Sequence, residues 1–231
     1  MKPQDSTIRL WDLPTRLFHW TLVVCVVGAY TTVKLGGLWM DWHIRFGLAV
    51  LGLISFRVVW GFCGPHYARF RQFVRGPVTV WRYTRGMVDH VAGHNPLGAC
   101  SIVALMLVLG FQAFSGLFAN DDVLSAGPLA HLNADLSATL TGLHKLNEWL
   151  VLSLVVLHVG AIFWYQKIRK QDLIGPMIVG DARVPPGQIA LAVNTQDSWK
   201  LRLAALILAL LIATVVWWIS GLGSGADSSY L

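Results

Sequence analysis

Histidine is the residue type in this chain that points most directly to chemistry, because imidazole binds transition metals and exchanges protons near neutral pH. Of the eight histidines, His19, His43, His144 and His158 lie in or beside strongly apolar stretches. In TGLHKLNEWLVLSLVVLHVGAIF, residues 141–163, two imidazoles stand fourteen positions apart in a segment long enough to cross a bilayer. Polar side chains at such depths are costly unless they are paired, and they commonly have a function.

The segments that carry these histidines have the composition of transmembrane helices. The chain of 231 residues is 55% hydrophobic and only 13% charged, whereas a soluble domain carries about 25% charged residues. Apolar runs long enough to span a bilayer, without strand alternation, predict helices. Five such spans occur, at residues 17–33, 43–62, 97–118, 146–165 and 203–220. We therefore expect an all-α integral membrane protein, with a four-helix transmembrane bundle and a fifth C-terminal transmembrane helix.

Charge alternates between the loops and predicts the orientation. The N-terminal segment, the loop after the second span and the loop 167–202 are rich in Lys and Arg, whereas residues 119–143 contain three aspartates and no Lys or Arg. Basic loops stay in the cytoplasm, so we expect the N-terminus inside and the C-terminus in the periplasm. The first span has a long charged leader and no small-residue cleavage site after it, so we expect it to be retained rather than cleaved. A positive face against anionic lipid explains the net charge of +6 without nucleic acid.

These boundaries divide the chain into five expected segments. They are a cytoplasmic N-terminal segment (1–16), the four-helix bundle (17–166), a cytoplasmic loop (167–202), the fifth transmembrane helix (203–220) and a periplasmic tail (221–231).

The four histidines resolve into two pairs at matching depths. Fourteen residues return a helix to within about 40° of the same face and advance it by about 21 Å. Because the fourth span runs inward, His144 lies near the outer surface and His158 near the inner one. His43 begins the second span at the outer surface, and His19 begins the first span at the inner surface. Two bis-histidine haems stacked between helices would require this arrangement.

The haems expected here are of the b type, because the chain has no CxxCH motif for covalent attachment. A single histidine at a helix end can instead reach interfacial water, and depth matching of all four argues against that alternative. The remaining histidines are His66, His90 and His94 in the basic inner loop and His131 in the outer loop. His90 or His94 is an alternative inner ligand, although we favour solvated loop positions for all four.

Four separated blocks resemble the bacterial cytochrome b561 group, which includes the b-type cytochrome subunit of membrane-bound nickel–iron hydrogenases. They are RLWDLPTRLFHW (9–20), DWHIRFGL (41–48), FRVVWGFCGPHYARFRQFVRGP (56–77) and TGLHKLNEWLVLSLVVLHVGAIFW (141–164). The resemblance implies a four-helix bundle with two haem b groups ligated from helices one, two and four. Carried onto this chain, the ligands are His19, His43, His144 and His158. The fifth span departs from many relatives, and it is expected to stabilise the bundle or dock a partner.

The expected function is electron transfer in the bacterial inner membrane, as a subunit rather than a stand-alone enzyme. Electrons would pass through two haems b between a periplasmic redox protein, a hydrogenase or a cytochrome c, and the quinone pool. Arg45 and Arg57 are candidate partners of haem propionates, and the alternative for both is snorkelling to the lipid headgroups. Glu148 could orient a ligand or serve a quinone proton, or cap the interface.

Three alternatives stay open from the sequence. One is a self-contained quinone-linked oxidoreductase of the same fold, such as a superoxide oxidase. A second keeps the subunit role with another electron donor, for example a formate dehydrogenase. The third is a haem-free channel, carrier or membrane anchor whose histidines relay protons or bind metal.

Overall fold

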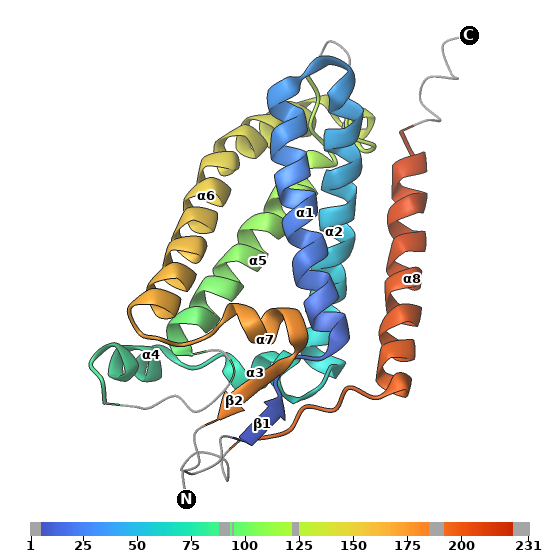
Figure 1. The fold of residues 1–231 in the computed structure, drawn as a ribbon. Helices are drawn as coiled ribbons and strands as arrows, with labels where there is room; N and C mark the ends of the chain where they lie inside the picture. The colour runs from blue at the N-terminus through green and yellow to red at the C-terminus, as the bar shows by residue number, and fades with distance from the viewer. Residues whose placement is uncertain (1–5, 88–92, 94, 122–124, 185–191, 224–231) are drawn as a thin grey trace, which may run out of the picture. The chain divides into compact units, whose positions relative to one another are not determined.

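The computed structural model describes residues 6–87, 93, 95–121, 125–184 and 192–223. Within these residues, five helices are long and apolar enough to cross a membrane (Figure 1). They are α1 (Leu13–Leu35), α2 (Met40–Cys63), α5 (Pro96–Gly116), α6 (Ala134–Lys167) and α8 (Trp199–Gly221). The expected all-α integral membrane fold with five spans is confirmed.

The helices match the expected spans except at the start of α6. That helix begins at Ala134 rather than residue 146, because the Asn133 side chain caps it by accepting the Leu136 N–H at 2.8 Å. Its first turns are too polar for hydropathy to detect.

Short elements connect the spans. They are the strands β1 (Ser6–Arg9) and β2 (Asp181–Val184), the helices α3 (Phe70–Phe73), α4 (Pro77–Thr84) and α7 (Ile174–Val179), and the 3₁₀ turns η1 (Gly37–Trp39), η2 (His66–Ala68) and η3 (Ala130–Leu132).

The chain forms two compact units, which are described separately. Unit 1 comprises residues 1–17, 57–104 and 156–205, and unit 2 comprises residues 18–56, 105–155 and 206–231.

Unit 2 is organised around an apolar core to which α1, α2, α5 and α6 all contribute. Its buried members are Cys25, Val50, Ile54, Leu109, Ala113 and Val151. Close approach of α1 and α2 depends on Gly28, where an added Cβ would lie 2.7 Å from the Phe46 ring. An added Cβ at Gly52 would lie 3.6 Å from the side chain of Val216 on α8. Four helices therefore share one core, and α8 lies against α2.

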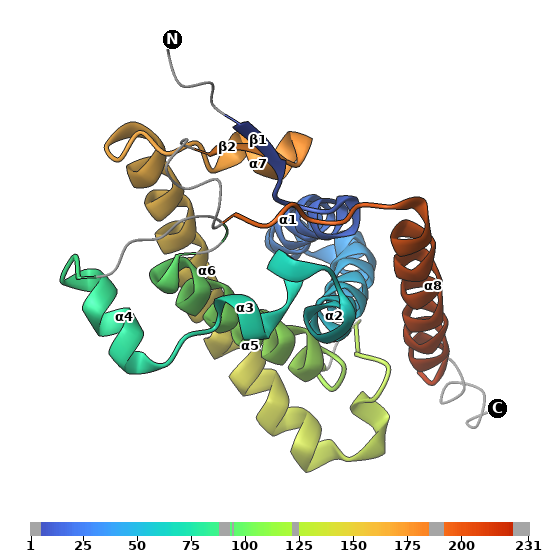
Figure 2. The same cartoon turned by 90° about the horizontal axis from the view of Figure 1, so that it is seen from below.

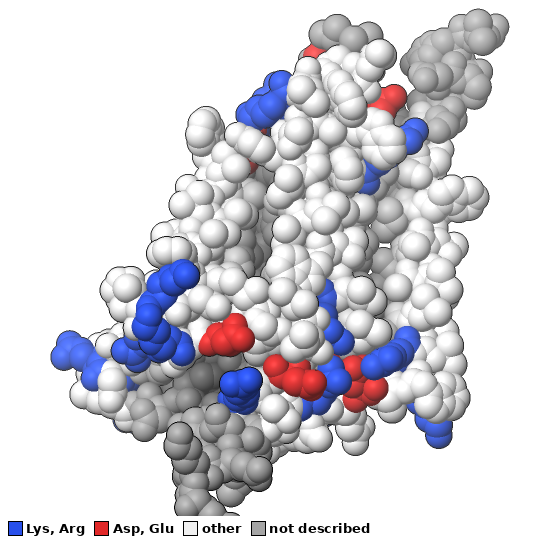
Figure 3. All heavy atoms as spheres, in the orientation of Figure 1, with Lys and Arg blue, Asp and Glu red and all other residues white. Residues whose placement is uncertain are grey.

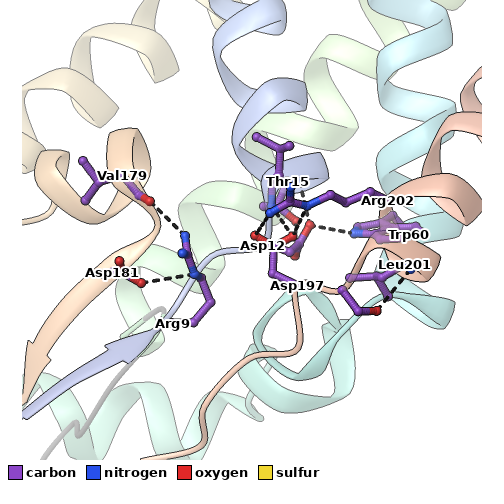
Figure 4. Close-up of polar contacts among 11 residues, drawn as sticks. Arg9, Asp12, Thr15, Trp60, Val179, Asp181, Asp197, Leu201 and Arg202 are labelled. Carbon is purple, nitrogen blue, oxygen red and sulfur yellow. Dashed lines mark hydrogen bonds and ion pairs between the residues drawn. The ribbon is translucent and has the colours of Figure 1, made fainter.

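Unit 1 is held by a contact that we call the N-terminal clasp: residues 6–13 bound between residues 179–184 and residues 194–197. The strands β1 and β2 pair antiparallel, with Arg9 opposite Asp181 (Figures 1 and 2). On the other side, the Thr195 N–H donates to the Arg9 carbonyl at 2.8 Å. The Arg9 guanidinium also binds Asp181 at 3.1 Å and donates to the Val179 carbonyl at 2.9 Å (Figure 4). Four of the long helices separate the two strands in sequence, so an even number of crossings returns β2 to the side of β1.

The clasp leads directly into the cap of α1. Asp12, which is 1% exposed, accepts hydrogen bonds from the Thr15 N–H and the Thr15 hydroxyl, each at 2.8 Å (Figure 4). The Trp60 indole donates to the same carboxyl at 3.3 Å. Burial raises the pKa of Asp12, and these hydrogen bonds oppose the shift. A capped aspartate thus begins the first span and ties it to α2.

Charge is segregated along the helices. On the face drawn in Figure 3, charged side chains gather around β1, β2, α4 and the adjoining loops, with a smaller group at the other end of the long helices, whereas the sides of these helices are almost uncoloured. An apolar surface of this kind is what a lipid environment requires.

Candidate functional site

His43 and His144 face each other in unit 2. His43 lies in the first turn of α2 and His144 near the N-terminal third of α6, and their ring centroids are 6.2 Å apart with planes at 88°. Both rings are half-buried, whereas Leu146 beside His144 is 68% exposed. The apolar neighbours therefore face outward and the imidazoles face the interior.

The ring nitrogens of both histidines have polar partners. Nδ1 of His43 lies 2.9 Å from the Ala29 carbonyl, which can only accept, so Nδ1–H is the donor and Nε2 carries the lone pair. Nδ1 of His144 lies 3.1 Å from the Ser115 hydroxyl, and its Nε2 lies 3.1 Å from the Gln112 side-chain nitrogen. Metal-binding histidines typically donate their second N–H to a carbonyl or similar acceptor in this way.

His43 and His144 lie close enough together that both would hold one metal-containing group. Among the described residues, no group of three or more His, Cys, Asp or Glu side chains could hold a metal ion. Two imidazoles alone suit a metal whose other ligands come from a macrocycle, and the residues present fit a haem.

The other two candidate ligands belong to different units. His19 lies on α1 in unit 2, with its ring edge-on to Trp20 at a centroid distance of 5.0 Å. His158 lies on α6 in unit 1 and is half-buried between Leu157 and Val159, which are 66% and 59% exposed. Each imidazole is less exposed than the apolar residue that follows it, Trp20 or Val159. The pairing of His19 with His158 stays a prediction from the sequence.

A family model described as prokaryotic cytochrome b561 matches residues 10–180. The chain belongs to the prokaryotic cytochrome b561 family. Searches among curated proteins and among solved structures gave no match. The resemblance inferred from the sequence is confirmed, and with it a b-type cytochrome that works in electron transfer in the membrane. The helix α8 lies beyond the matched residues.

Arg57 is the more informative of the two arginines in this cytochrome b561. It is 3% exposed, and its guanidinium lies over the rings of Phe70 and Phe73, at 5.1 and 5.8 Å. Its Nη1 is buried and has no hydrogen-bond partner among the described residues. A buried cationic donor with a spare N–H suits an anionic group such as a haem propionate, and this side chain does not snorkel.

Arg45 is placed differently. It is exposed, and its guanidinium lies 5.1 Å from the centre of the Trp42 ring, which itself is 47% exposed. This position is compatible with snorkelling, and its assignment to a propionate stays a prediction.

The other polar candidates have ordinary surroundings where they are described. His66 packs edge-on against Tyr67, and His131 is exposed in η3. His90 and His94 lie outside the described residues. Glu148 forms an ion pair of 2.6 Å with Lys34.

Three polar residues around His144 were missed from the sequence. Gln112 and Ser115 lie on α5, and Asn147 lies on α6, where its side-chain nitrogen donates to the Gln112 side-chain oxygen at 2.7 Å and to the Val108 carbonyl at 3.1 Å. The available signal was two polar residues three positions apart in an otherwise apolar span, which places both on one face.

Proposed function

We propose that this cytochrome b561 is a di-haem electron-transfer subunit of the bacterial inner membrane. His43 and His144 would hold an outer haem b, and His19 and His158 an inner one. Electrons would pass between a periplasmic redox protein, a hydrogenase or a cytochrome c, and the quinone pool.

The facing pair of His43 and His144 carries this proposal. Each ring has its Nδ1 bound by a polar partner, and the centroids are 6.2 Å apart. Nε2 is therefore the candidate ligand atom of each ring, and on His144 it would have to be released by Gln112. When bound, haem iron supplies one-electron chemistry, cycling between the ferric and ferrous states. The chain supplies the ligands and an apolar surrounding that excludes water.

The length of α6 supports a second site. His144 and His158 lie on one continuous helix, and fourteen residues correspond to a rise of about 21 Å along it. One helix would thus contribute one ligand near each membrane surface.

The clasp supports the orientation. Pairing of β1 with β2 requires both on one side of the membrane, and both segments lie among the basic residues expected in the cytoplasm. The N-terminus would then be cytoplasmic, and α8 would carry the C-terminus to the periplasm.

Two measurements test the function. The chain purified in detergent should show a reduced-minus-oxidised spectrum of low-spin haem b, with two haems per chain, all extracted by acidified acetone. A colourless protein would overturn the proposal in favour of a transporter or anchor, and one haem per chain would overturn the di-haem form.

Single substitutions test the pairing. His43→Ala and His144→Ala should remove the same component of a redox titration, and His19→Ala and His158→Ala should remove the other. His131→Ala, at an exposed histidine, is the matched control and should leave both components in place. Loss of one shared component in His144→Ala and His158→Ala would refute the assignment.

A further inference from the structure

We propose that Asn147, Gln112 and Ser115 form a hydrogen-bonded network that fixes the tautomer of His144 and thereby selects Nε2 as its ligand atom. The inference rests on the proposed outer haem site and assigns a positioning role to α5, which supplies none of the four candidate ligands. All of the contacts involved lie within unit 2.

The network is anchored on a backbone group that cannot be reversed. The Val108 carbonyl only accepts, and it lies 3.1 Å from the side-chain nitrogen of Asn147. The same amide nitrogen donates its second hydrogen to the Gln112 side-chain oxygen at 2.7 Å. Because the oxygen of Gln112 faces Asn147, its nitrogen must face His144.

The direction of each further hydrogen bond follows from this anchor. The Gln112 nitrogen is a donor only, so Nε2 of His144 accepts at 3.1 Å and cannot carry a proton. A neutral imidazole then has its hydrogen on Nδ1, which donates to the Ser115 hydroxyl at 3.1 Å. That hydroxyl has its own acceptor, the Gln112 carbonyl at 3.1 Å, so its oxygen is free to accept. Each N–H and O–H hydrogen in the network therefore has one assigned acceptor.

Ser115 and Gln112 therefore act in opposite ways on the same ring. Ser115, at 0% exposed, holds Nδ1–H and leaves the lone pair on Nε2, where a metal would bind. Gln112 occupies that lone pair and must release it before Nε2 can bind a metal. The second hydrogen of its amide donates to the His144 carbonyl at 3.2 Å, so the side chain keeps a contact after release.

Among the described residues, no side-chain network of this kind holds His43. Its Nδ1–H donates to a helix carbonyl of Ala29, which no side-chain substitution removes. Among the described residues, side-chain hydrogen bonds therefore reach the proposed outer site through His144.

The test compares two substitutions with a matched control. Ser115→Ala removes the Nδ1–H acceptor, and loss of such a partner lowers metal affinity about 10–100-fold. Because that acceptor makes the imidazole a stronger donor to ferric iron, its loss should raise the midpoint potential of the component that His144→Ala removes. A tenfold preferential loss for the ferric state corresponds to about 59 mV. Ser55→Ala is the matched control, because the Ser55 hydroxyl donates to the Leu51 carbonyl of its own helix. It should change neither the haem affinity nor the midpoint potential.

Gln112→Leu should change the rate of haem uptake in the opposite direction to Ser115→Ala. The assay uses the protein purified in detergent from haem-limited cells and titrated with haemin. Gln112→Leu should take up haem faster than wild type, because Nε2 of His144 is no longer occupied. Ser115→Ala should take up haem more slowly than wild type. Ser115→Thr, which keeps the hydroxyl, should restore the wild-type potential.

Opposite effects on uptake separate positioning from packing, since a purely structural role would move both variants alike. The inference is overturned if Ser115→Ala leaves the potential unchanged, if Ser55→Ala shifts it equally, or if Gln112→Leu slows uptake. A wild-type chain that takes up no haem would instead refute the proposed function.

Discussion

Gly116→Ala should weaken haem binding at the proposed outer site although it replaces none of the candidate ligands. Gly116 is the last residue of α5, and an added Cβ there would lie 3.1 Å from Cε1 of His144 and 3.5 Å from Nδ1. Carbon atoms prefer separations of about 3.5–4.0 Å, so the ring would have to retreat by about 0.4–0.9 Å. The imidazole would thus be pushed off its present position.

The size of the effect follows from what holds the ring. Its hydrogen bond from Nδ1 to Ser115 is already 3.1 Å long, and the retreat would take it beyond the usual limit of about 3.2 Å. Overpacking typically costs about 1–3 kcal/mol. If this falls on the ligated state, in which the ring position is fixed, haem affinity should drop about 5–150-fold.

The assay is a haemin titration of the detergent-purified variant, followed by a redox titration. Gly110→Ala is the matched control, because a Cβ on the same helix there would lie 3.5 Å from Ile54, an ordinary contact. The reasoning is refuted if Gly116→Ala binds both haems as wild type does. It is refuted equally if Gly110→Ala is as damaging, or if the lost component is the one that His158→Ala removes.

Three further outcomes are expected. Arg57→Met should lower the midpoint potential of the component that His158→Ala removes, because a positive charge beside a propionate favours the reduced haem. Arg57→Lys keeps the charge and should shift this potential less. Equal shifts in the two variants would argue that the charge of Arg57 is not the cause. Asp197 accepts two hydrogen bonds of 3.0 Å from Arg202, and although burial opposes its ionisation, these contacts lower its pKa. Its contribution is therefore present above its unfolded pKa of about 3.9 and lost as the pH falls through the lower folded value. Because Arg202 is 47% exposed, Asp197→Asn should cost about 1 kcal/mol or less at pH 7. Thermal unfolding should show that difference shrink as the pH falls below about 4 and vanish only below the lower folded pKa. A reporter active only in the periplasm should work when fused after residue 231 and fail when inserted near residue 80, and the reverse pattern would exchange the inner and outer histidines.

The spans were predictable because each is a long, almost uninterrupted run of apolar residues. A run of about twenty apolar residues leaves few alternatives, and α1, α2, α5 and α8 begin and end within a few residues of the expected limits. The strands β1 and β2 were missed because four residues are too few to show alternation. Their partner segments lie far apart in the sequence, and local patterns contain no information about such pairing.

The sequence led to the candidate ligands but not to the residues that surround them. His43 and His144 stood out as polar residues near span ends, and the topology suggested that they meet. Ser115 and Gln112 gained meaning only when α5 was placed beside α6. The Ala29 carbonyl has no signal in the sequence at all, since every residue has one.

The clasp has a consequence for the order of events during synthesis. Arg9 must wait for Val179, 170 positions later, which at about 5–20 residues per second is a delay of about 10–35 s. During that time β1 is an unpaired strand edge, of the kind that other chains can capture. Closure becomes possible only when an even number of helices has crossed the membrane. A chain that has skipped one crossing leaves β1 and β2 on opposite sides, and the clasp stays open. Pairing of these two four-residue strands thus requires that an even number of helices has crossed the membrane between them.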